Sequence, residues 1–81
     1  MNRQELFKRI SVDPNVCHGR PCIRGTRVWV SLIVDNIADE VPEAEILAAY
    51  PQLSHTDILA ALAYAAEMTR ERVIPVSIDR P

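Results

Sequence analysis

The side chains best suited to chemistry in this sequence are two cysteines and a histidine, Cys17, His18 and Cys22. A structural zinc site takes four ligands, and His55, the second histidine, lies far along the chain. A thiol nucleophile needs a base that a third group holds in position, and no such group follows the adjacent Cys17 and His18. We therefore predict free thiols, no metal, no cofactor and no enzymatic activity.

Three arginines, Arg20, Arg24 and Arg27, lie around two predicted turns. Guanidinium groups together with backbone amides near a glycine suit a phosphate or another anion. For Arg20 and Arg24 the sequence leaves two roles open, contact with a nucleic acid or partner protein and a structural role. For Arg27, which follows Gly25 and Thr26, bracing of the turn is favoured over binding.

Charge is unevenly distributed along the 81 residues. Residues 1–30 carry a net charge of +4, residues 31–69 contain seven acidic residues and no Lys or Arg, and residues 70–81 carry +1. A polyanion is attracted to the first segment and repelled by the second. Any nucleic-acid contact is therefore expected from the basic side chains of the first segment. Those expected to contribute most are Arg3, Lys8, Arg9, Arg20 and Arg24.

Hydrophobic spacing predicts a mainly α fold, a three-helix helix-turn-helix bundle of homeodomain-like or winged-helix-like type. A small N-terminal β element precedes the bundle and a strand-like tail follows it. The predicted boundaries are a lead-in over 1–9, a single domain over 10–70 (β element 10–30, helices about 31–39, 42–50 and 55–70) and a tail over 71–81.

The third predicted helix begins with a capping-box pattern, in which Ser54 is the cap and Asp57 the third helical residue. In a helix-turn-helix protein the start of this helix meets the bases, so Ser54, His55 and Thr56 are candidate nucleic-acid-binding residues. No cation in residues 31–69 offsets Asp57 there. The face expected to be buried consists of Ile58, Leu59, Leu62, Ala65, Ala66 and Thr69. Ser31 is the expected cap of the first helix.

Two apolar features are candidates for an interface. The first is Trp29, at the junction of the β element and the first helix, although core packing is favoured there over a dimer contact. The tail is apolar for a terminus and needs a second copy or a partner to cover it. Its candidate interface residues are Val73, Ile74, Val76 and Ile78. We expect a homo- or hetero-oligomer.

The run from Gly19 to Arg27, GRPCIRGTR, resembles the bacterial domain-of-unknown-function family 433. The resemblance extends over roughly residues 9–67 and implies a helix-turn-helix fold. Members of the family are similar to antitoxins of the VapB type, which are encoded beside a PIN-like ribonuclease toxin. Two positions depart from the family pattern. His18 replaces a usual glycine, and Glu40 and Pro42 replace a Gly-Ser/Thr pair between the first two helices. Without that second glycine, the end of the first helix is expected to be looser or differently shaped.

The resemblance implies an antitoxin-like protein that binds and neutralises a PIN-like ribonuclease and represses its own operon, through DNA binding by a dimer or by the toxin complex. The alternatives are a stand-alone helix-turn-helix DNA-binding regulator and an interaction module that does not bind DNA. The sequence has no secretory signal, and its longest uncharged run, 58–66, is too short for a bilayer. We expect a cytoplasmic protein.

Overall fold

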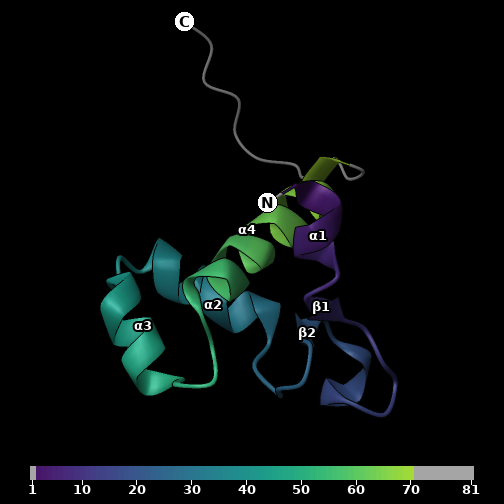
Figure 1. The fold of residues 1–81 in the computed structure, drawn as a ribbon, viewed down its shortest axis with the longest axis horizontal. Helices are drawn as coiled ribbons and strands as arrows, with labels where there is room; N and C mark the ends of the chain where they lie inside the picture. The colour runs from purple at the N-terminus through teal and green to yellow at the C-terminus, as the bar shows by residue number, and fades with distance from the viewer. Residues whose placement is uncertain (1, 71–81) are drawn as a thin grey trace, which may run out of the picture.

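Four α-helices and a two-stranded antiparallel ribbon make up residues 2–70, the part of the chain that the structure, a computed structural model, describes (Figure 1). The elements are α1 (Arg3–Phe7), β1 (Ile10–Ser11), the 3₁₀ turn η1 (Cys17–Gly19), β2 (Cys22–Ile23), α2 (Val30–Ala38), α3 (Glu43–Ala49) and α4 (His55–Arg70). The prediction of a mainly helical fold with a small β element is confirmed. The expected lead-in contains a helix, α1, which Asn2 caps by accepting the backbone N–H of Glu5 at 2.8 Å.

The longest helix, α4, is the element on which α1 and α2 pack, while α3 packs against α2 (Figure 1). Isoleucines from three different elements fill the centre, and Ile23, Ile33 and Ile46 are almost fully buried. Each buried side chain of this size contributes about 1.5–3 kcal/mol to folding. Among residues 2–70 no helix has the length and apolar character needed to cross a membrane.

The buried face of α4 differs from the predicted one. Ile58 is buried as expected, but Leu59 and Leu62 are 40% and 38% exposed. Thr69 is also exposed, and Ala65 and Ala66 are only half-buried. The buried positions are taken by Ala60, Ala61 and Ala63. Because α1 and α2 both pack on α4, small side chains are needed to let the helix axes approach.

The β element is a short ribbon of β1 and β2, and a turn at Gly25 follows β2. Ile10 is paired with Ile23, and Ser11 with Cys22. Gly25 has a φ of 82°, a left-handed conformation that glycine adopts without steric cost. Next to it, the Thr26 hydroxyl donates to the carbonyl of Ile23 at 2.7 Å. The same hydroxyl accepts the backbone N–H of Val28 at 3.0 Å, so Thr26 braces the turn.

The helix α2 starts and ends differently from the prediction. It begins at Val30, one residue early, and Trp29 rather than Ser31 stands at the N-cap, without a side-chain cap bond. At the other end, Glu40 has a φ of 63°. Backbone N–H groups of Glu40 and Val41 donate to the carbonyls of Ile37 and Asn36, each at 3.0 Å.

These two bonds form the closed C-terminal motif that usually has glycine at the left-handed position. The expectation of a looser or differently shaped end is therefore wrong. Glu40 adopts the left-handed conformation itself, although its Cβ crowds the following carbonyl oxygen there.

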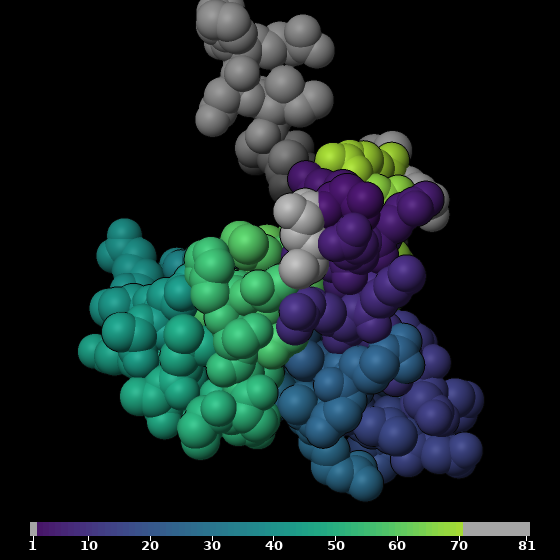
Figure 2. Space-filling model, in the orientation of Figure 1, coloured from purple at the N-terminus to yellow at the C-terminus, as the bar shows by residue number. Residues whose placement is uncertain are grey.

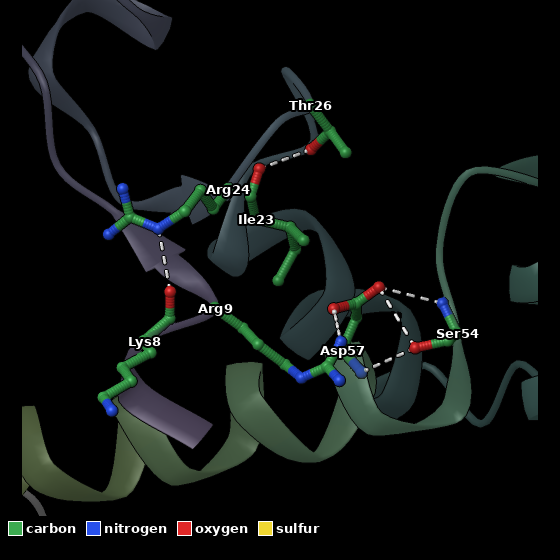
Figure 3. Close-up of polar contacts among 7 residues, drawn as sticks. All are labelled: Lys8, Arg9, Ile23, Arg24, Thr26, Ser54 and Asp57. Carbon is green, nitrogen blue, oxygen red and sulfur yellow. Dashed lines mark hydrogen bonds and ion pairs between the residues drawn. The ribbon is translucent and has the colours of Figure 1, made fainter. Parts of the chain in front are cut away.

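The predicted capping box at the start of α4 is confirmed, and it has a third member (Figure 3). The Asp57 carboxylate accepts the backbone N–H of Ser54 at 2.9 Å, and the Ser54 hydroxyl accepts the backbone N–H of Asp57 at 3.3 Å. Nη1 of Arg9 donates to the same carboxylate at 3.0 Å. Asp57 is only 7% exposed, and the cation that pairs with it, Arg9, comes from outside residues 31–69.

Replacing Glu40 with glycine should stabilise the protein. The change removes the left-handed strain of a side chain that is itself exposed, and the free energy of unfolding is expected to rise by about 1 kcal/mol. Urea denaturation of the purified variant measures this. Asp39→Gly is the matched control, because Asp39 has a φ of −83° and gains nothing from glycine. Equal or lower stability of Glu40→Gly would contradict the strain.

Replacing Asp57 with alanine should destabilise the protein by about 2–3 kcal/mol, because the change removes one of the two bonds of the capping box and a charge-assisted bond to Arg9. Thermal and urea unfolding measure the loss. The control is Glu67→Ala, which breaks the exposed pair between Glu67 and Arg70 and should cost less than about 0.5 kcal/mol. Similar effects of the two variants would mean that Asp57 does not anchor α4.

Candidate partner-binding site

Arg24 has a structural role (Figure 3). Its Nε donates to the carbonyl of Lys8 at 2.8 Å, and its Nη2 donates to the carbonyl of Ile10 at 2.9 Å. Its backbone N–H donates to the carbonyl of Arg9 at 2.7 Å. Arg24 therefore holds the segment between α1 and β1 against β2. The sequence left open whether Arg24 contacts a ligand or has a structural role, and these bonds are structural.

Arg27 does not have the bracing role that was favoured for it. Its side chain is exposed and makes no hydrogen bond or ion pair to another of residues 2–70. Thr26 braces the turn instead, and Arg27 borders a hollow of about 290 Å³ beside Cys22. Its charge is therefore available to a partner, but no second cation stands beside it in this hollow.

Arg20 and Trp29, which the sequence singled out separately, lie together. The Arg20 guanidinium stands over the Trp29 ring, with its central carbon 4.9 Å from the ring centroid. This distance is within the range of cation–π attraction. The turn η1 directs the chain into this arrangement through left-handed φ angles of 52°, 56° and 78° at Cys17, His18 and Gly19. His18 thus adopts a left-handed conformation that glycine favours.

Arg20 also lies at the edge of an apolar groove of about 330 Å³. The groove is formed by the residues around Pro21, by α2 and by the C-terminal half of α4. Its lining residues are Arg20, Pro21, Val30, Ser31, Val34, Asp35, Tyr64, Ala65 and Met68. The floor suits an aliphatic or aromatic side chain, and the two charged residues, Arg20 and Asp35, suit polar groups beside it.

The candidate residues at the start of α4 are separate from this groove, which reaches only the other half of the helix. Ser54 is occupied by the capping box. Nδ1 of His55 lies 2.8 Å from a carboxylate oxygen of Glu43, which links α4 to α3. Thr56 is half-buried. An acidic side chain thus stands where a recognition helix would meet phosphates.

The two thiols are part of the core around the ribbon. Cys17 and Cys22 are buried and free, and Sγ of Cys22 lies 3.6 Å from the carbonyl oxygen of Thr26. Burial raises the pKa of the Cys22 thiol, and the neighbouring Cys17 thiol raises it further. A raised pKa lowers the thiolate fraction, and hence the reactivity, at neutral pH. Within residues 2–70 no group of three His, Cys, Asp or Glu side chains is placed to hold a metal.

Two site features were missed from the sequence. One is the pairing of Arg9 with Asp57, which are distant in the chain and carry no local signal of contact. The other is the outward position of Leu59 and Leu62, whose signal is the nine-residue uncharged run 58–66. The predicted interface residues of the tail lie outside the described residues. They are Val73, Ile74, Val76 and Ile78.

Residues 10–65 match the model of a family described as "Protein of unknown function (DUF433)". The crystal structure of a DUF433 member protein from Anabaena variabilis ATCC 29413 is similar, with a TM-score of 0.73 and 35% sequence identity, over 84% of this chain and 67% of that chain. No curated protein matches the sequence. The family match covers more than half of the chain, which therefore belongs to the DUF433 family.

Proposed function

We propose that this chain is a non-catalytic, antitoxin-like protein that binds and neutralises a PIN-like ribonuclease through the groove beside Arg20. The main support is the position of the Arg20 guanidinium, 4.9 Å from the Trp29 ring centre and at the edge of an apolar groove. Arg and Trp are among the side chains most enriched at the energetic centres of protein interfaces. The identity of the partner rests on the resemblance of the family to antitoxins of the VapB type.

The charges near the groove suit an acidic partner. Arg20 forms no ion pair with another of residues 2–70, so its charge is available to a carboxylate. The ring of Trp29 holds the guanidinium in place, which reduces the entropy lost on binding. A ribonuclease of this type is expected to carry several acidic residues. An apolar side chain of the partner in the groove and an acidic one on Arg20 would together give affinity and orientation.

The proposal includes a helix-turn-helix arrangement of α2, α3 and α4, in which a five-residue connection, 50–54, joins the last two helices.

The acidic surroundings of α4 disfavour direct reading of duplex DNA. His55 is bonded to Glu43, and no Lys or Arg occurs between residues 31 and 69. Phosphate neutralisation supplies most of the affinity for duplex DNA. A protein partner is therefore the better supported ligand of this chain.

Co-expression with an adjacent PIN-like gene tests this function. We expect the ribonuclease to co-purify with the tagged chain and to lose activity in the complex. Arg20→Glu should raise the dissociation constant of the purified complex at least about tenfold, because it reverses the charge at the edge of the groove. Isothermal titration calorimetry measures this.

Arg3→Glu is the matched control, because it reverses an exposed charge that does not line this groove. Its affinity for the ribonuclease should be close to that of the unchanged chain. Equal binding by Arg20→Glu and the unchanged chain, or no complex at all with the adjacent gene product, would contradict the proposed function.

A further inference from the structure

A second apolar surface lies between α1 and α4 and shares no residue with the groove beside Arg20. We call it the α4 patch. It surrounds a hollow of about 400 Å³ and consists of Arg3, Leu6, Leu59, Leu62, Ala63 and Ala66. In Figure 2, α4 crosses the visible face of the molecule between α3 and α1. The patch is thus a surface of the longest helix that its own chain leaves partly open.

The shape of the α4 patch combines protruding and recessed side chains on one helix. Leu59 and Leu62 are about two-fifths exposed, whereas Ala63, one residue further on, is 4% exposed. Large side chains beside small ones allow two copies of the same helix to interdigitate, with each leucine entering the recess of the other copy. A surface that is its own complement is what a two-fold symmetric interface requires.

The charges around the α4 patch favour one orientation of such a pair. Residues 58–66 carry no charge, and the Asp57 before them is buried and paired with Arg9. The basic Arg3 lies beside the C-terminal half of α4, where it lines the hollow with Ala66. At the other end of α4, the acidic Glu43 of α3 lies 2.8 Å from His55.

An antiparallel pair of α4 helices places the Arg3 end of one copy against the Glu43 end of the other. A parallel pair would place like charges together. The antiparallel arrangement also opposes the two helix dipoles favourably. Apart from this uncharged run, residues 31–69 carry a net charge of −7, so two copies repel each other through most of their helical surface.

We propose that the α4 patch is the interface of a two-fold symmetric homodimer, in which the α4 helices of two copies pack antiparallel. Leu59 and Leu62 of each copy fill the hollow of the other. The dimer leaves the groove beside Arg20 open on both copies, because none of its lining residues belongs to the patch. Dimer formation is therefore independent of the function proposed above and is measured on the purified chain alone.

Sedimentation equilibrium tests the interface. The unchanged chain should have about twice the 9.1 kDa mass of one copy at micromolar concentration. Leu62→Glu should weaken self-association at least about tenfold, because it places two like charges near the symmetry axis and loses leucine burial. Leu59→Gln, which adds no charge, should weaken it as well. Leu32→Glu is the control, since Leu32 is 36% exposed on α2 and lies outside the hollow.

The orientation has its own test. Arg3→Glu should weaken the dimer at low ionic strength and have little effect at 1 M salt, because salt screens the attraction to the acidic end of the other copy. Arg20→Glu, the same change at an exposed arginine outside the α4 patch, should leave the dimer intact. Circular dichroism should show unchanged helix content in all these variants, because each replaces an exposed side chain.

A monomeric unchanged chain, or a Leu62→Glu variant that dimerises as well as the unchanged chain, would overturn the proposal. A monomeric chain in which Leu62→Glu abolishes capture of the ribonuclease would assign the patch to that partner instead. Equal dimerisation of Arg3→Glu and the unchanged chain at low salt would overturn the antiparallel arrangement. Loss of ribonuclease binding in Arg20→Glu with an intact dimer would leave the proposed interface standing.

Discussion

The buried carboxylate of Asp57 is the contact on which most of the fold depends. It accepts the backbone N–H of Ser54, which completes the capping box of α4, and it joins that end of the helix to Arg9, in the segment that follows α1. Because α1 and α2 both pack on α4, fixing its start also fixes the positions of the other two helices. Arg24 secures the same segment from β2 through the carbonyls of Lys8 and Ile10. One acidic and two basic side chains thus connect the ribbon to the helices.

These contacts change how the positive net charge of residues 1–30 is interpreted. Its positive net charge suggests a surface for polyanions, yet Arg9 neutralises a buried carboxylate and Arg24 is bonded to backbone carbonyls. The basic side chains that stay exposed, such as Arg3 and Arg20, lie at the edges of two different apolar hollows. A single cation beside an apolar hollow suits a protein partner. Affinity for a phosphate backbone depends instead on several cations that neutralise successive phosphates.

Local signals were sufficient to predict the three main helices, the turn at Gly25 and the Ser54–Asp57 capping box, because each depends on neighbours in the chain. Contacts between distant segments were not predictable in this way. The approach of Arg9 to Asp57 follows from how α1 packs, and the stacking of Arg20 on Trp29 follows from the left-handed turn at His18. Glu40 illustrates a related failure, since closing the end of α2 outweighs the local preference against a left-handed glutamate.

The exposure of leucines on α4, where the sequence predicted a buried face, has the largest functional consequence. A helix that is contacted by two others in a small domain needs alanine at its contact positions, and Ala60, Ala61 and Ala63 serve this purpose. Its leucines then lie outward, where each exposed apolar side chain lowers solubility unless something covers it. In a chain of 81 residues, burying those leucines in the core would have added stability. Their outward placement, between a basic and an acidic end of the same helix, is accounted for if a second copy covers them.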